Sequence, residues 1–229
     1  LRSGTIDVKY MTAKEEDILT SSNLIQQGKV IGKLLESIIA DPKVKLDDML
    51  IGDKNALMVG TRILGYGKDY DCVIVDPDTG EKVNVVIDLT KLKHKEIDDK
   101  SYDNGNLFSF ELPNSKKVIE FKLLTQADEV KITELMKDYE KLTELTGVDK
   151  SVTTRLKYVI QSVDGDTNQK TIDDFVDNEF LTLDARAFRV YRESIEPDII
   201  MKFDYTSQTG GSHKLDIPLG VDFFWPAAE

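Results

Sequence analysis

The stretch Met11-Thr-Ala-Lys-Glu-Glu-Asp-Ile-Leu-Thr20 marks the point where one segment ends and the first strong helix begins. Thr12 stands three residues before Glu15, so its hydroxyl can accept the Glu15 backbone N–H while the Glu15 carboxylate accepts the Thr12 N–H. Glu15, Glu16 and Asp17 then fall in the first turn, where the positive end of the helix dipole stabilises negative charge. We therefore expect a capped helix here, and we interpret these acidic residues as a helix terminus and not as a catalytic set.

The spacing of apolar residues around this helix changes several times between a strand-like and a helical repeat. Before it, residues 5–10 alternate β-favouring and polar side chains, which predicts a half-buried strand. After it, apolar residues at helical spacing predict one helix from Ser21 to Pro42 and another after Asp53. Two hairpins are then predicted, over 70–89 around Asp76-Pro-Asp-Thr-Gly80 and over 107–124 around Pro113-Asn-Ser115.

The second half of the chain returns to helices and then to strands. Helical spacing predicts helices over 125–147, 151–163, 171–180 and 181–195, and alternation predicts strands over 199–205, 214–217 and 221–226. Segregated helical and strand regions favour an α+β fold over a parallel α/β sheet. We expect four segments (1–67, 68–124, 125–197 and 198–229) in one compact unit, with the C-terminal strands packed on the first β region.

Composition narrows the function classes. The chain of 229 residues is 40% hydrophobic and carries a net charge of −12, so we expect a folded protein that binds neither nucleic acid nor an anionic membrane. Its single cysteine, Cys72, excludes an intrachain disulfide framework and a multi-cysteine metal site. No apolar run reaches the roughly 18–20 residues that span a bilayer, so we predict no membrane anchor.

The motifs that resemble catalytic or ion-binding sites each lack residues that those sites require. Gly60-Thr-Arg-Ile-Leu-Gly65 has the spacing of a P-loop start, but Tyr66-Gly67 replaces the lysine and hydroxyl residues. Asp164-Gly-Asp-Thr-Asn168 resembles the start of a calcium loop without its later glycine and glutamate. We expect His94 and His213 at the surface, and Cys72 as a small buried hydrophobe. The sequence therefore predicts no catalytic residue, no metal site and no cofactor.

Two features near the C-terminus are candidates for an interface. Arg186, Arg189 and Arg192 recur every three residues opposite the apolar stripe of the last helix, as either a solvated face or a docking strip for an acidic neighbour. Phe223, Phe224 and Trp225 are consecutive, so a strand would point them to both faces. They are either core residues or anchors of an interface.

Several ordered motifs resemble the baseplate hub subunit family of T-even-like contractile-tail bacteriophages, which is distantly similar to tail assembly chaperones. They are Thr12-Ala-Lys-Glu-Glu-Asp-Ile-Leu-Thr20, Lys33-Leu-Leu-Glu36, Ile51-Gly-Asp-Lys-Asn-Ala56, Arg62-Ile-Leu-Gly-Tyr-Gly67 and Phe223-Phe-Trp-Pro226. The resemblance covers nearly the whole chain.

The resemblance also implies two zinc-ribbon knuckles, because many family members carry paired cysteines at each. Here the corresponding stretches are Asp76-Pro-Asp-Thr-Gly80 and Thr206-Ser-Gln-Thr-Gly210, and all four thiols are absent. We expect a zinc-ribbon-like pair of hairpins without metal, held by hydrogen bonds of Asp76, Thr79, Thr206 and Thr209 and by strand packing.

The resemblance implies a non-enzymatic structural subunit of the baseplate hub, located in the virion tail and assembled in the host cytoplasm. Its expected partners are other tail proteins: hub, tube or tape-measure components. One alternative is a tail assembly chaperone that binds tape-measure or hub proteins and then leaves. Another is a metal-free hydrolase with an unrecognised carboxylate pair.

Overall fold

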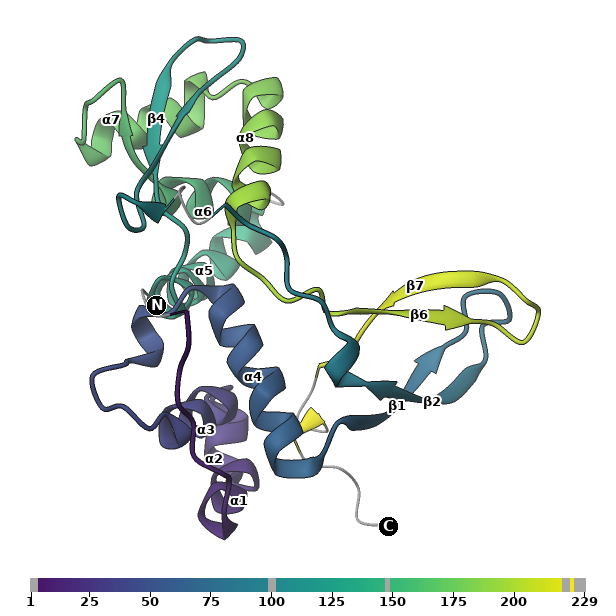
Figure 1. Ribbon diagram of the computed structural model, residues 1–229. Helices are drawn as coiled ribbons and strands as arrows, with labels where there is room; N and C mark the ends of the chain where they lie inside the picture. Colours follow the sequence, from purple (N-terminus) through teal and green to yellow (C-terminus); the bar gives the residue numbers. More distant parts are fainter. Residues whose placement is uncertain (1–3, 99–101, 147–148, 220–222, 225–229) are drawn as a thin grey trace. The chain divides into compact units, whose positions relative to one another are not determined.

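The computed structural model describes residues 4–98, 102–146, 149–219 and 223–224. The chain forms two compact units (Figure 1): unit 1 comprises Leu1–Lys95 and Asp198–Glu229, and unit 2 comprises Glu96–Pro197. Helices and small antiparallel sheets occupy separate regions, which confirms the predicted α+β class. The four-segment division at residues 67, 124 and 197 stays a prediction. No helix in the described ranges is long and apolar enough to cross a membrane.

Unit 1 begins with helices: α1 (Ala13–Leu19), α2 (Ser22–Gln26), α3 (Val30–Ile38), a 3-10 turn (Leu46–Asp48) and α4 (Ile51–Tyr66). The predicted capping box is present at α1, where the Glu15 carboxylate accepts the Thr12 backbone N–H at 2.8 Å and the Thr12 hydroxyl at 2.7 Å. The hydrogen bond from this hydroxyl lowers the pKa of Glu15. The single helix predicted from Ser21 is wrong, because Gly28, with φ of 66°, separates α2 from α3.

The strand predicted over residues 5–10 is reduced to one bridge between Val8 and Ile39. Backbone hydrogen bonds flank this bridge, from Lys9 N–H to the Ile38 carbonyl at 2.7 Å and from Ala40 N–H to the Asp7 carbonyl at 3.0 Å. The prediction of a full strand was wrong because the partner segment is the end of α3, which offers too short an extended stretch for a ladder.

Two antiparallel hairpins complete unit 1: β1 (Asp69–Val75) pairs with β2 (Lys82–Asp88), and β6 (Lys202–Thr206) pairs with β7 (Ser212–Asp216). A 3-10 turn, Leu89–Lys91, follows β2. The alternating pattern of β1 and β2 buries Tyr70, Ile74 and Ile87, which belong to one face of the hairpin. The core of unit 1 combines Tyr70 and Ile87 with buried apolar side chains of α1, α3 and α4.

Two of the aromatic residues near the C-terminus, Phe223 and Phe224, lie in this core. Phe223 and Phe224 are 0% and 1% exposed, and their rings meet edge to face at 5.1 Å. The Phe223 ring also meets the Tyr70 ring at 5.0 Å. Both phenylalanines lie in a 3-10 or turn segment, so the strand predicted over 221–226 is wrong for them, and Trp225 lies outside the described residues.

Unit 2 combines a three-stranded antiparallel sheet with helices. The sheet has the order β3 (Phe108–Glu111), β4 (Val118–Phe121) and β5 (Ile160–Val163). The helices are α5 (Gln126–Thr146), α6 (Ser151–Val159), α7 (Gln169–Asp174), a π-helical turn (Phe175–Glu179) and α8 (Thr182–Ile195). Phe121 and Phe188 are fully buried and meet edge to face at 4.8 Å, which packs α8 on the sheet.

The helix predicted over residues 151–163 is wrong in its second half. It ends at Val159, and Ile160–Val163 becomes β5 on the free edge of β4. Ile160, Ser162 and Val163 are all buried, and the Ser162 hydroxyl donates to Glu120 of β4 at 2.7 Å. The apolar residues fit either period, and pairing with β4 decides in favour of the strand because it satisfies the backbone groups.

Candidate functional site

The tips of the two hairpins of unit 1 are joined through a buried carboxylate. Asp76 directly follows β1 and is only 1% exposed. Its carboxylate accepts the Tyr205 hydroxyl at 2.8 Å and the Ser207 hydroxyl at 2.7 Å, both from the second hairpin. It also accepts the backbone N–H groups of Asp78 at 2.8 Å and Thr79 at 3.3 Å in its own turn. One side chain therefore organises its own turn and holds the other hairpin.

These contacts keep Asp76 ionised. Burial by itself would raise the pKa of this carboxyl, because desolvation disfavours the charged form. The hydrogen bonds from Ser207, the Asp78 N–H and Tyr205 outweigh burial and lower the pKa of Asp76 to about 2. The same contact raises the pKa of the Tyr205 phenol, since the phenolate would face the carboxylate.

A second carboxylate extends the junction toward the surface. Asp78 accepts the Thr209 hydroxyl at 2.5 Å and lies 2.8 Å from Nε2 of His213. The hydrogen bond from Thr209 lowers the pKa of Asp78, and the contact with His213 adds to this effect. We refer to Asp76, Asp78, Tyr205, Ser207, Thr209 and His213 as the hairpin junction.

Glycine is required where the two turns approach most closely. A Cβ atom on Gly211 would lie 2.3 Å from a carboxylate oxygen of Asp78 and 2.8 Å from Nε2 of His213. Both distances are shorter than real Cβ contacts, so a side chain at this position would push the Asp78 carboxylate away from Thr209 and His213. The neighbouring Gly210 has φ of 91°, a backbone conformation that favours glycine.

The four residues expected at the knuckles have different roles in the structure. Asp76 and Thr209 join the two hairpins, whereas Thr79 acts within its own turn, where its hydroxyl accepts the Glu81 N–H at 3.3 Å. Thr206 is the last residue of β6 and is exposed. The side chains at these positions do not fit zinc, because no thiolate is present and the junction oxygens already pair with one another.

The sequence reasoning missed Asp78, Tyr205, Ser207 and His213 as members of the junction. His213 was expected at the surface, but it is half-buried and faces Asp78. Tyr205 and His213 are cross-strand partners in the β6–β7 register. Period-two alternation along this hairpin places both on one face with Phe203 and Leu215, and that signal could have identified them.

The contacts of the hairpin junction hold the two turns together. The Ser207 hydroxyl donates to Asp76, so His213 does not act as its base. Asp76 and Asp78 both have lowered pKa values, whereas a general acid at neutral pH needs a raised one. Among the described residues, no group of three or more His, Cys, Asp or Glu side chains could hold a metal ion.

The three arginines of α8 do not form one strip. Each step of three residues turns about 60° around a helix, so Arg186 and Arg192 point about 120° apart. Arg192 is turned toward Glu196, with Nε 3.7 Å from a carboxylate oxygen. Arg186 and Arg189 are exposed and form no ion pair within the described residues. Only these two remain as candidates for a docking surface.

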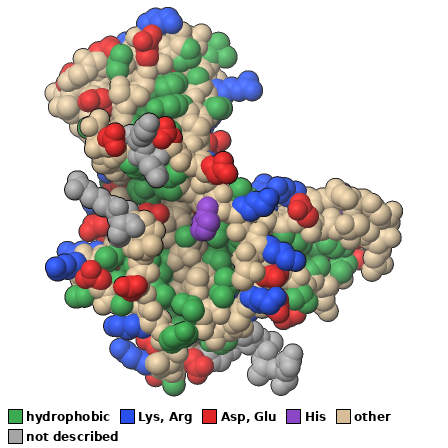
Figure 2. Space-filling view, viewed as in Figure 1, with side chains coloured by type: hydrophobic (Ala, Val, Ile, Leu, Met, Phe, Trp, Pro, Cys, Tyr) green, Lys and Arg blue, Asp and Glu red, His purple; other side chains and the backbone are tan. Residues whose placement is uncertain are grey.

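A shallow groove lies beside Arg186, on the outer face of α8. Its volume is about 520 Å³, and it is lined by Phe110, Leu183, Arg186, Ala187, Val190, Tyr191 and Ser194. Figure 2 shows hydrophobic side chains gathered over α8 in unit 2, with basic side chains at their margin. We call these residues the α8 groove.

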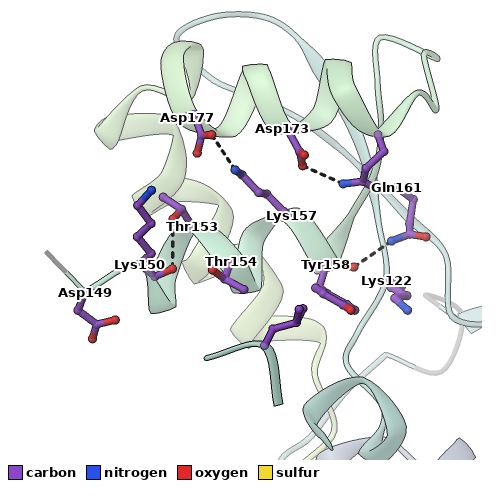
Figure 3. A pocket seen from close by; sticks show the side chains of 12 residues that line it. Lys122, Asp149, Lys150, Thr153, Thr154, Lys157, Tyr158, Gln161, Asp173 and Asp177 are labelled. Carbon is purple, nitrogen blue, oxygen red and sulfur yellow. Dashed lines mark hydrogen bonds and ion pairs between the residues drawn. The ribbon is translucent and has the colours of Figure 1, made fainter. Parts of the chain in front are cut away.

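Unit 2 contains a second hollow, between α6 and the segment formed by α7 and its π-helical turn (Figure 3). Its volume is about 730 Å³. Three lysines and three aspartates line it, and Lys157 pairs with Asp177 at 2.7 Å. The equal numbers of opposite charges give this hollow no net charge that would favour an anion or a cation.

Comparison with known proteins gives one match. No curated protein and no solved structure matches the chain significantly. A family model described as T4 bacteriophage base plate protein matches residues 1–225 of the 229. The chain therefore belongs to the T4 bacteriophage base plate protein family.

Proposed function

We propose that the protein is a structural subunit of the baseplate hub and acts by contacts with other tail proteins. Family membership supports a place in the virion tail. The observation that carries the proposal is the outer face of the β1–β2 hairpin, where Val73, Val75 and Val86 are 56%, 57% and 65% exposed. The three valines share one face of this hairpin, beside Asp71, Lys82 and Asn84, and we take this mixed apolar and polar face as the surface that a tail protein covers.

The second hairpin of unit 1 has no comparable apolar face. The outward positions of β6–β7 are all polar or charged: Lys202, Asp204, Thr206, Ser212, Lys214 and Asp216. The two hairpins share the hairpin junction, so their strands are held together while the valine face points outward. A rigid, preorganised apolar face lowers the entropy cost of assembly.

The valine face can be tested without changing strand geometry. Replacing Val73 and Val86 by threonine retains β-branching but exposes a hydroxyl to any apolar partner. We expect the double variant to fold normally and to associate with the baseplate about tenfold more weakly, which corresponds to a loss of about 1.4 kcal/mol of apolar burial. Val152→Thr is the matched control, because Val152 is also exposed (55%) but lies on α6.

Purified, fully assembled tails decide between the two assembly roles. A hub subunit is present in finished tails at a fixed ratio to other baseplate proteins, and quantitative mass spectrometry measures this ratio. An assembly chaperone is present during tail building and absent from the finished tail. Absence of the chain from finished tails would therefore refute the hub proposal and favour the chaperone.

A further inference from the structure

The α8 groove combines an apolar floor with an exposed arginine, Arg186, for which the described residues supply no ion-pair partner. We infer that it binds an acidic, amphipathic segment of a partner tail protein, an inference that rests on the proposed assembly function and names the chemistry of one partner. Leu183 and Val190 on its rim are 65% and 63% exposed. They are seven residues apart and therefore lie on the same side of α8.

The floor of the groove is fixed by aromatic stacking. The rings of Phe110 on β3 and Tyr191 on α8 stack at 4.6 Å with an interplanar angle of 15°. Behind them, Phe188 and Phe121 are fully buried, and Phe121 meets Tyr191 edge to face at 6.0 Å. The floor therefore rests on the core of unit 2 and needs no rearrangement to receive a ligand.

A buried carboxylate positions α8 against the hairpin that supplies Phe110. Asp184, in the first turn of α8, is 0% exposed and accepts the Asn114 N–H at 2.8 Å and the Ser115 N–H at 3.0 Å. Asn114 and Ser115 belong to the turn between β3 and β4. The contact ties the start of the helix to the β3–β4 hairpin, so the two walls of the groove are held in register.

The charge at the rim identifies the kind of occupant. Arg186 lines the groove and forms no ion pair within the described residues, whereas Arg189 is exposed on the same helix but does not line the groove. The whole sequence carries 42 acidic and 30 basic residues, so this arginine on an apolar surface is not explained by a general excess of basic residues. A guanidinium group binds carboxylates through paired hydrogen bonds.

The same observations disfavour the other classes of occupant. A nucleic acid or an anionic membrane is attracted by many basic residues together, whereas this acidic chain presents one, Arg186, in the lining of the groove. A partner segment with leucine-like side chains on one face and glutamate or aspartate beside them satisfies both the groove and Arg186. A second copy of this chain is a separate outcome of the test.

Binding is tested first with a defined probe and the full-length chain. The probe is a fluorescent helical peptide with leucines along one face and glutamates beside them, and the control peptide replaces each glutamate by lysine. We expect fluorescence anisotropy to show saturable binding of the acidic peptide, at least tenfold tighter than of the lysine peptide, and weakened by salt. Equal binding of both peptides, or binding of neither, would overturn the inference.

Two variants locate this binding in the groove. Arg186→Glu and Val190→Ser are each expected to weaken binding of the acidic peptide about tenfold, through charge repulsion and lost apolar contact. Lys131→Glu makes the same charge change at another exposed helix position of unit 2 and is expected to have no effect. Equal weakening by Lys131→Glu would mean that the peptide responds only to net charge.

A photo-crosslinker in place of Val190 identifies the occupant in assembling tails. We expect a cross-link to an acidic, apolar segment of another tail protein, and none from the same group placed at Val130, which is 43% exposed on α5. A cross-link to a second copy of this chain, or no cross-link in tails that contain the chain, would overturn the inference and leave the hub proposal intact. A chain absent from finished tails that still binds the acidic peptide would refute the hub proposal alone.

Discussion

Truncating Phe224 to alanine tests whether the aromatic residues near the C-terminus act in the core or at an interface. The Phe224 side chain is 1% exposed and contacts the ring of Phe223, which in turn meets Tyr70. Phe→Ala changes in a packed core cost about 3–5 kcal/mol, as lost apolar transfer plus the cavity left behind. Whole domains are stable by only about 5–15 kcal/mol, so Phe224→Ala should remove a large part of the free energy of unfolding.

The assay is urea unfolding of the full chain followed by far-ultraviolet circular dichroism. Two compact units can unfold separately, so the expected result is a lower midpoint for one transition, by about 1–5 M for a slope of about 1–3 kcal/mol per M. Tyr10→Ala is the matched control, because Tyr10 is an aromatic residue of unit 1 that is 72% exposed, and its loss should stay within about 0.5 kcal/mol.

One outcome would refute this reasoning. If Phe224→Ala unfolds at the wild-type midpoint but fails to enter baseplates, the ring is an interface anchor and its burial does not reflect the assembled state. Loss of both stability and assembly agrees with a core residue, because an unstable subunit cannot assemble. The comparison of midpoint and incorporation in the same variant therefore separates the two roles.

Two further predictions concern the buried carboxylates and the close approach of the turns. Because hydrogen bonds hold the folded-state pKa of Asp76 at about 2, below its ordinary 3.8, its stabilisation is present above about pH 4 and lost as the pH falls through about 2. Asp76→Asn should reduce the loss of unfolding free energy of unit 1 at acid pH. Asp184, whose pKa is also lowered to about 2, should behave in the same way in unit 2 when replaced by asparagine. A pH profile of unfolding parallel to that of the wild type would contradict either prediction. Gly211→Ala should displace Asp78 and speed hydrogen exchange of the turn amides, whereas Gly32→Ala, with no atom within 4 Å of its Cβ, should not.

Part of the hairpin junction was predictable because it depends on local turn chemistry. Asp76 begins a turn rich in proline and glycine, and its contacts with the Asp78 and Thr79 N–H groups are short-range. The contacts to Tyr205 and Ser207 span 129 and 131 residues. Such pairs follow from how the strands pack, which local sequence patterns do not specify.

The α8 groove was likewise predictable from the sequence only in part. The regular spacing of arginines indicated a basic helix face, but the sequence did not show that Arg192 turns toward Glu196 or that Phe110 supplies a second wall. Leu183 and Val190 lie outside the apolar stripe of α8 that contains Phe188 and Ile195, and both are exposed. Their exposure is decided by which side of α8 the sheet covers.

The sequence by itself determined the elements that depend on neighbouring residues. The Thr12–Glu15 capping box and the two hairpins of unit 1 lie within a few residues of their predicted places, because caps and turns are formed by contacts along the chain. Tertiary structure alone decided that residues 160–163 form β5 and that Phe223 and Phe224 fill the core of unit 1. The apolar residues of such a short segment fit both the helical repeat of 3.6 residues and the strand repeat of two. Its conformation is therefore decided by the neighbouring strand that pairs with its backbone and by the side chains that cover it.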